Sequence, residues 1–151
     1  MNRHDGSVRA SIPAVFVHGL FGPFADPAAL RQLGEMECTA PDLDGYGAFA
    51  ERRVTLEGQV RALREHIEAR HPGSPVHLVA HSIGAVYAFA LADREPGLVQ
   101  SLTTVEGNFT LADAFWSRSI AALGAEDAQR VITQRLDDPD AFLAADGVPV
   151  T

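Results

Sequence analysis

The feature that constrains this chain most is a buried strand that runs straight into a helix. Residues 76–80, Val-His-Leu-Val-Ala, are typical of a buried strand, and the mostly apolar pattern of 82–94 predicts the helix. Ser82 lies at the junction, with the small residues Ala80 and Gly84 two positions to either side. A strained strand-to-helix turn needs small residues there, because larger side chains would collide. The pattern therefore predicts that Ser82 is presented at the carboxyl end of a parallel strand, where open α/β sheets bind ligands.

Further strands and helices alternate along the chain. Apolar runs predict strands over 14–17, 37–40 and 98–105. Apolar residues that recur about every 3.6 positions predict a helix over 55–70, and a short helix is expected over 26–33, between the first two strands. Such alternation favours an α/β fold, a parallel sheet with right-handed crossovers and flanking helices.

Two more helices are predicted near the end of the chain, over 111–123 and 126–136. They follow the last predicted strand without another strand between them. We therefore divide the chain into a sheet-containing part, residues 1–110, and a helical segment, residues 111–151.

A loop with two glycines, His-Gly-Leu-Phe-Gly at 18–22, follows the first strand. Glycines let a backbone turn sharply and present free amides to a substrate oxygen. The Leu20 amide is the expected donor, with Phe21 next, and the Ile83 amide at the start of the following helix is the second. The alternatives are a generic glycine turn here and a Ser82 that only caps its helix.

The order of these motifs resembles the α/β-hydrolase superfamily. The matching segments are Val-His-Gly-Leu-Phe-Gly at 17–22, Ala-Pro-Asp-Leu-Asp-Gly-Tyr-Gly at 40–47 and Val-Ala-His-Ser-Ile-Gly-Ala at 79–85. The resemblance covers residues 14–110 and implies an α/β-hydrolase-like core followed by a helical cap segment. It also implies esterase-like or related acyl chemistry without a cofactor, with Ser82 as the nucleophile.

The chain departs from the family pattern in two places. Ala80 replaces the usual first glycine, which is a tolerated variation. The family's catalytic histidine lies after two further strands, and the sequence ends at Thr151 before they could form. The sheet is therefore expected to be incomplete at its C-terminal end, with an exposed edge that invites a homodimer. Whether the chain is a fragment or a natural short form is left open.

None of the six histidines is an evident substitute for the missing base. Three are excluded by their expected places on a flanking helix or toward the opposite end of the sheet: His66, His71 and His77. His81 adjoins Ser82 but is expected to point away along the strand pleat. His18 is expected to shape the glycine loop, and His4 lies on the polar lead-in.

The acid of a triad is easier to place. Glu106 ends the strand that follows the Ser82 helix, and some α/β-hydrolases, the haloalkane dehalogenase group among them, carry their triad carboxylate at this point. Glu106 is therefore the expected acid, with Asp113 as the backup. The alternative is that Glu106 caps the turn at Gly107 and Asn108.

Four residues near these motifs are assigned to substrate binding: Phe21, His81, Asn108 and Trp116. Trp116, with Phe109 and Phe115, would line an apolar acyl pocket, although aromatic residues at this spacing equally pack a cap. No metal site is expected, because the Asp42 and Asp44 pattern is simply explained by a turn.

Charge and cysteine content exclude some classes of partner. The formal net charge of −8 disfavours nucleic acid and anionic membrane faces, which would repel the chain. No apolar run approaches the roughly 18 to 20 residues that span a bilayer. The single cysteine, Cys38, fits a reducing compartment. We therefore expect a soluble, cytoplasmic protein with a small-molecule acyl substrate.

The sequence thus predicts a serine hydrolase that acts on a carboxylic ester or related acyl compound, with Leu20 and Ile83 as oxyanion donors. Acyl transfer or carbon–carbon bond hydrolysis would use the same groups, and the substrate is left open. Loss of the base in a comparable triad costs on the order of a million-fold in turnover, so activity is expected to be very low. The alternative is a catalytically incomplete interaction module, or a half-domain completed by a partner chain.

Overall fold

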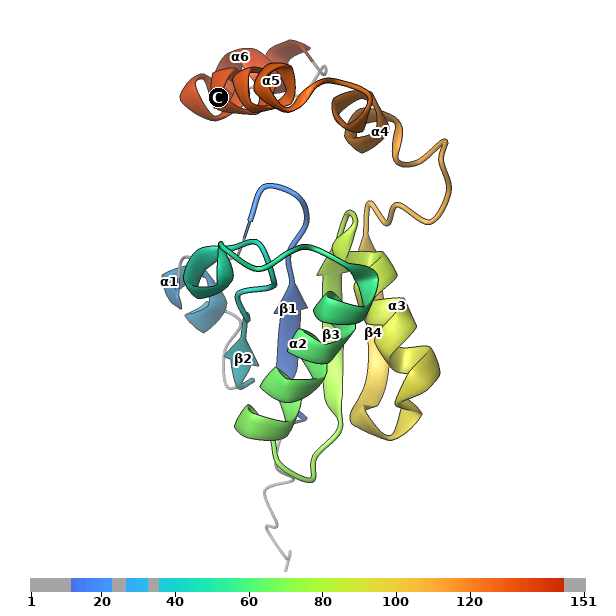
Figure 1. The fold of residues 1–151 in the computed structure, drawn as a ribbon. Helices are drawn as coiled ribbons and strands as arrows, with labels where there is room; N and C mark the ends of the chain where they lie inside the picture. Colours follow the sequence, from blue (N-terminus) through green and yellow to red (C-terminus); the bar gives the residue numbers. More distant parts are fainter. Residues whose placement is uncertain (1–11, 23–26, 33–35, 146–151) are drawn as a thin grey trace, which may run out of the picture. The chain divides into compact units, whose positions relative to one another are not determined.

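A computed structural model of the chain describes residues 12–22, 27–32 and 36–145. The chain divides into two compact units, Met1–Phe109 and Thr110–Thr151 (Figure 1). Each unit is treated by itself below.

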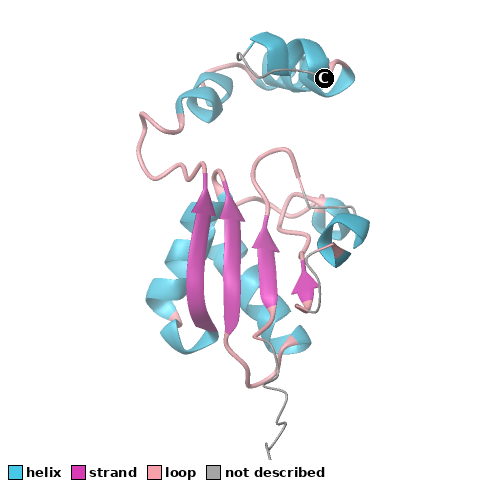
Figure 2. Ribbon diagram, turned by 180° about the vertical axis from the view of Figure 1, so that it is seen from behind, coloured by secondary structure: helices cyan, strands magenta, loops and turns pink. Residues whose placement is uncertain are grey.

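The first unit is built on a four-stranded parallel sheet in the order β2-β1-β3-β4. The strands are β1 Ala14–Val17, β2 Cys38–Thr39, β3 Val76–His81 and β4 Val99–Val105. These strands confirm the predicted parallel α/β sheet. Because all four strands run the same way, their carboxyl ends lie at one end of the sheet (Figure 2).

Three helices accompany this sheet: α1 Pro27–Arg31, α2 Leu56–Arg70 and α3 Gly84–Arg94. Short 3₁₀ turns, η1 Gly47–Phe49 and η2 Pro96–Leu98, lie in the connections. Helix α2 begins where Thr55 Oγ1 accepts a hydrogen bond from the Gly58 amide. Arg94 then joins α3 to α2 through two hydrogen bonds to the Glu57 carboxylate, of 2.6 and 2.9 Å.

The sheet buries one face more completely than the other. Val76, Leu78 and Ala80 of β3 are fully buried, whereas the residues that alternate with them are half-exposed. Helices α2 and α3 both lie on the first face, and Figure 2 shows no described helix of this unit across the second. The predicted buried strand at 76–80 is therefore confirmed, and its second face is the less buried one among the described residues.

The segment between β2 and α2 is fixed by a buried glutamine. Gln59 Oε1 accepts from the Asp44 amide, and Gln59 Nε2 donates to the Asp44 carbonyl oxygen, each over 2.9 Å. The Asp44 carboxylate pairs with Arg52 over 3.2 Å and with Arg61 over 3.4 Å. Gln59 thus satisfies both backbone groups of a buried residue far from any strand partner.

The second unit contains three helices, α4 Phe115–Ala121, α5 Ala125–Asp137 and α6 Pro139–Ala145. Helix α4 is shorter than predicted, because Thr110 and Asp113 hydrogen-bond each other in a turn before it. Helix α6 was not predicted, although Asp138 followed by Pro139 is a start signal. None of the helices in the described ranges combines the length and the apolar character needed to cross a membrane.

We predict that Gln59→Met lowers the free energy of unfolding by about 2–6 kcal/mol. The replacement keeps the length of the side chain but leaves the Asp44 amide and carbonyl without partners, and each such loss costs about 1–3 kcal/mol. Urea unfolding followed by far-UV circular dichroism measures the change. Gln100→Met, at an exposed position of β4, is the control, and equal stabilities of the two variants would contradict the role given to Gln59.

Candidate active site

Ser82 follows directly on β3 and has a backbone φ of 54°, in the left-handed region that side-chain-bearing residues rarely adopt. Its amide donates to the Val105 carbonyl oxygen over 2.9 Å. Its carbonyl oxygen accepts from the Ala85 amide over 3.0 Å and from the Asn108 amide over 3.3 Å. The strained turn expected at this serine is therefore present, and hydrogen bonds to α3 and to the loop after β4 hold it.

The small residues around Ser82 are required by close backbone contacts. A Cβ atom at Gly84 would collide with the His18 carbonyl oxygen and would lie 2.8 Å from the Val17 carbonyl oxygen. A Cβ atom at Gly19 would lie 2.9 Å from Ser82 Cβ. The loop after β1 therefore rests directly against the serine turn and the first turn of α3.

The glycine loop is held from outside by Tyr46. The Tyr46 hydroxyl donates to the Leu20 carbonyl oxygen over 2.7 Å, and the Tyr46 ring packs edge-on against His18 with centroids 4.5 Å apart. Tyr46 was given no role from the sequence, although it lies in the segment 40–47 that carried part of the resemblance. Within the described part of the chain, the Leu20 and Ile83 amides donate to no protein acceptor.

The Ser82 hydroxyl meets a residue that had been assigned to substrate binding. Ser82 Oγ donates to Asn108 Oδ1 over 2.8 Å, and Asn108 Nδ2 donates to the Glu106 carbonyl oxygen over 3.4 Å. Asn108 is therefore in direct contact with the serine itself.

Glu106 and His81 form a pair beside this contact. His81 Nε2 lies 3.4 Å from Glu106 Oε2, and the Glu106 side chain is 82% exposed. Glu106 also has a left-handed backbone, with φ of 52°. The expected acid is thus at the carboxyl end of the sheet, but the imidazole next to it belongs to the residue before Ser82.

The remaining described histidines are engaged elsewhere. His18 is buried, its Nδ1 donates to the Gly19 carbonyl oxygen over 2.9 Å, and burial lowers its pKa. His66 and His71 both contact Thr39 Oγ1, and His77 contacts Ser101 Oγ. Among the residues that the structure describes, no histidine is hydrogen-bonded to Ser82 Oγ. His4 lies outside those residues.

The other assigned residues lie in separate surroundings. Phe21 is 48% exposed on the glycine loop, and Phe109 packs against Phe89 in the first unit. Trp116 belongs to the second unit, where its ring lies 4.7 Å from the Arg135 guanidinium and 6.5 Å from Phe142. Asp113, the backup acid, bonds Thr110 in the same unit. Trp116 therefore packs between helices of its own unit.

The acidic segment before η1 carries structural contacts. Asp42 Oδ2 accepts from the Ala48 amide over 3.0 Å, as a turn residue would. Asp44 differs from that expectation, because its carboxylate pairs with arginines rather than with its own turn. No group of three potential ligands in the described ranges is arranged to hold a metal ion.

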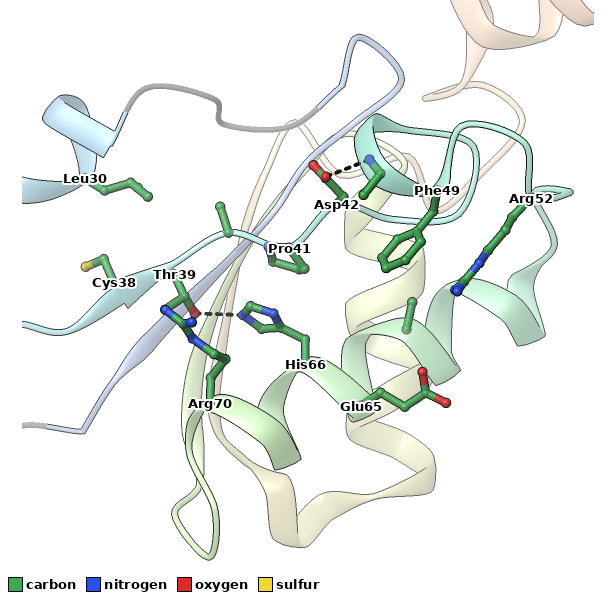
Figure 3. Close-up of a pocket in the computed structure, with 13 residues that line it drawn as sticks. Leu30, Cys38, Thr39, Pro41, Asp42, Phe49, Arg52, Glu65, His66 and Arg70 are labelled. Carbon is green, nitrogen blue, oxygen red and sulfur yellow. Dashed lines mark hydrogen bonds between the residues drawn. The ribbon is translucent and has the colours of Figure 1, made fainter.

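A cavity of about 790 Å³ lies beside this segment (Figure 3). It is lined by residues of β2, of the segment before α2 and of α2, among them Thr39, Arg52 and His66. Ser82 and the glycine loop do not line it. The cavity is therefore separate from the serine turn.

Comparison with known proteins decides the family. The model of the Alpha/beta hydrolase family matches residues 14–150, nearly the whole chain. This chain belongs to the alpha/beta hydrolase family. The chain is 34% identical over 107 residues to BODYGUARD 2 of Arabidopsis thaliana, named a probable lysophospholipase. That match covers 59% of the chain and 21% of the relative, so the chain spans about a fifth of the length of this relative.

Solved structures show the same fold for this chain. An extracellular alpha/beta-hydrolase from a Paenibacillus species matches with a TM-score of 0.59 and 17% identity, over 82% of our chain and 65% of its own. A carboxylesterase structure from Nitrososphaera gargenis matches with a TM-score of 0.58 and 23% identity, over 74% and 45% of the two chains. The serine turn of this chain therefore lies within the fold that the sequence predicted.

We predict that Gly84→Ala lowers the free energy of unfolding of the chain by about 3 kcal/mol and Gly19→Ala by about 1–3 kcal/mol, because each added methyl group overpacks a backbone contact. Gly97→Ala is the matched control, since a Cβ atom there meets nothing within 4 Å. It should change stability by less than about 0.5 kcal/mol. Urea unfolding compares the three variants, and equal effects would refute the close approach.

Proposed function

We propose that Ser82 is the nucleophile of a serine hydrolase that acts on a carboxylic ester or a related acyl compound. The observation that carries the proposal is the strained Ser82 backbone, with φ of 54°, at the carboxyl end of a central parallel strand. Strain of this kind costs about 1–3 kcal/mol and is retained mainly at functional sites. In this fold it aims the hydroxyl out of the sheet toward a bound substrate.

Two backbone amides support an oxyanion site next to Ser82. Leu20 lies on the loop that packs against the serine turn, and Ile83 begins the first turn of α3. Preorganised amides of this kind stabilise the negative oxygen of a tetrahedral intermediate. The positive end of the helix dipole favours the same charge. We therefore assign both amides as oxyanion donors.

The substrate class rests on the named relatives. Three Arabidopsis proteins at 30–34% identity are named probable lysophospholipases, and such enzymes cleave a carboxylic ester. The chain spans about a fifth of these relatives, so the substrate comes to this chain as a proposal. A water-soluble short-chain ester is the simplest first test compound.

Glu106 is the acid in this proposal, and no histidine in the described ranges is hydrogen-bonded to Ser82 Oγ as a triad base would be. The Glu106 carboxylate is exposed at the carboxyl end of the sheet, where it would orient an incoming imidazole. Without a base, oxyanion donors and substrate binding leave roughly 10³ to 10⁴ of rate over water. Weak turnover is therefore the expected activity of this chain by itself.

We also propose a cytoplasmic location, which rests on the lone Cys38. The thiol is half-buried, and burial raises its pKa, so little of it is the reactive thiolate. Such a residue needs no disulfide partner and fits a reducing compartment.

We predict that a fluorophosphonate probe labels the chain slowly and that Ser82→Ala abolishes the labelling. The Ser82 oxygen would bond to phosphorus as fluoride leaves, and the alanine variant has no such oxygen. Ser119→Ala, at an exposed serine of α4, should label like the unchanged protein. Labelling is read by intact mass. Equal labelling of the Ser82→Ala variant would exclude Ser82 as the nucleophile.

A second candidate function is a half-domain completed by another chain, and the uncovered edge of the sheet favours it. Strand β4 pairs only with β3 within the described residues, and five of its seven residues are exposed. It carries no charged side chain or proline of the kind that protects edges. Exposed Phe89, Val105 and Phe109 lie on or beside it. A second copy that pairs β4 with β4 would cover this edge.

We predict that the chain forms dimers across β4 and that Thr103→Lys shifts them toward monomers. Thr103 is exposed in the middle of β4, and in a symmetric pair the two added charges would oppose each other. Light scattering after size-exclusion chromatography measures the mass. Thr133→Lys, on an exposed site of α5, is the control. A stable monomer of the unchanged protein would remove this candidate.

A further inference from the structure

The loop after β4 holds Ser82 through both its backbone and its side chain. The Ser82 amide donates to the Val105 carbonyl oxygen, and the Asn108 amide donates to the Ser82 carbonyl oxygen. Ser82 Oγ adds a third hydrogen bond, of 2.8 Å, to Asn108 Oδ1. The position of Asn108 relative to the hydroxyl is therefore set by three contacts.

The Asn108 amide group is also oriented. Its Nδ2 donates to the Glu106 carbonyl oxygen over 3.4 Å, which leaves Oδ1, an acceptor only, for the serine. The loop has little room to shift, because a Cβ atom at Gly107 would lie 2.6 Å from the Phe109 ring and 3.2 Å from Ala85 Cβ. The loop is thus pressed against α3, with the amide oxygen facing Ser82.

We infer that Asn108 is a positioning residue for Ser82. We also infer that a basic side chain at position 108 would be the group that accepts the proton of the Ser82 hydroxyl. A serine hydroxyl can donate a single hydrogen bond, and here the amide oxygen accepts that hydrogen bond. An amide oxygen directs this proton but does not take it, because amides are protonated only in strong acid. Asn108 therefore orients Ser82 Oγ and leaves it an ordinary alcohol. This inference rests on the proposed role of Ser82 as nucleophile.

Variants at position 108 change the basicity of the acceptor at nearly constant shape. Asn108→Asp replaces the amide with an isosteric carboxylate, which can accept the proton, and Asn108→Ala removes the acceptor. In the labelling reaction Ser82 Oγ bonds to phosphorus, the phosphorus–fluorine bond breaks, and the hydroxyl proton passes to the carboxylate or to water. The labelling rate should therefore follow the order Asp, Asn, Ala.

We expect Asn108→Asp to label about 10- to 100-fold faster than the unchanged protein, the low end for a positioned general base whose pKa lies below the working pH. Asn108→Ala should label about 3- to 10-fold more slowly, as for the loss of one hydrogen bond. The advantage of Asn108→Asp should grow as pH rises through the pKa of the new carboxyl and then level off. Glu106, His81 and His18 are the titratable groups on the neighbouring segments, and they are common to all variants.

The outcomes separate this inference from the proposed function. If Ser82→Ala abolishes labelling but the three side chains at position 108 give equal rates at every pH, the role of Asn108 is wrong and the nucleophile stands. If Ser82→Ala still labels, the nucleophile is wrong. Thermal unfolding of each variant identifies any labelling rate that falls because the loop is no longer folded. If Asn108 were only a structural residue, Asn108→Asp would not label faster than the unchanged protein in a pH-dependent way.

Side-chain amide NMR tests the hydrogen bond without any reaction. The chain has two asparagines and five glutamines, so these signals are few. The pair of signals from the two Asn108 side-chain amide protons is identified by its loss in Asn108→Ala. This pair should shift in Ser82→Ala but not in the control Ser119→Ala. An unchanged Asn108 pair in Ser82→Ala would overturn the contact on which the inference rests.

Discussion

The structure around Ser82 depends on the close approach of two backbones at Gly84. The carbonyl oxygens of Val17 and His18 occupy the space that a side chain at position 84 would need. This contact brings the end of β1 to the first turn of α3, and Gly19 then lies against Ser82 Cβ. The Leu20 and Ile83 amides come near the serine as a result, because they belong to the two segments that meet there.

Buried polar contacts carry this arrangement outward to α2. Tyr46 holds the Leu20 carbonyl oxygen, and the segment that bears Tyr46 is fixed by Gln59 through both backbone groups of Asp44. Arg52 and Arg61 form ion pairs with the Asp44 carboxylate. Such networks are rigid when every member is satisfied. The glycine loop therefore owes its position to a helix that contributes no residue to the serine turn.

The serine turn of this chain forms without a histidine hydrogen-bonded to the Ser82 hydroxyl among the described residues. The turn needs only β3, α3, the loop after β1 and the loop after β4, all of which are present. The Ser82 hydroxyl nevertheless meets an amide oxygen, which directs its proton without taking it. Parallel sheets are usually covered on both faces, yet only one face of β3 is fully buried by described residues.

The sequence by itself determined the order of the strands and of every helix but α6, the strand-to-helix turn at Ser82 and the family. These follow from local patterns: apolar runs, periodicity near 3.6 residues, and small residues at positions 80 and 84. It did not reveal Tyr46, Gln59 or the contact between Asn108 and Ser82, because each joins segments far apart in the chain, and hydrogen bonds of this kind leave no periodic signal. The lower burial of one face of β3 among the described residues was also decided only by tertiary structure, since a buried strand pattern does not say which faces a helix reaches. Local chemistry thus placed the serine, and long-range packing decided what its hydroxyl meets.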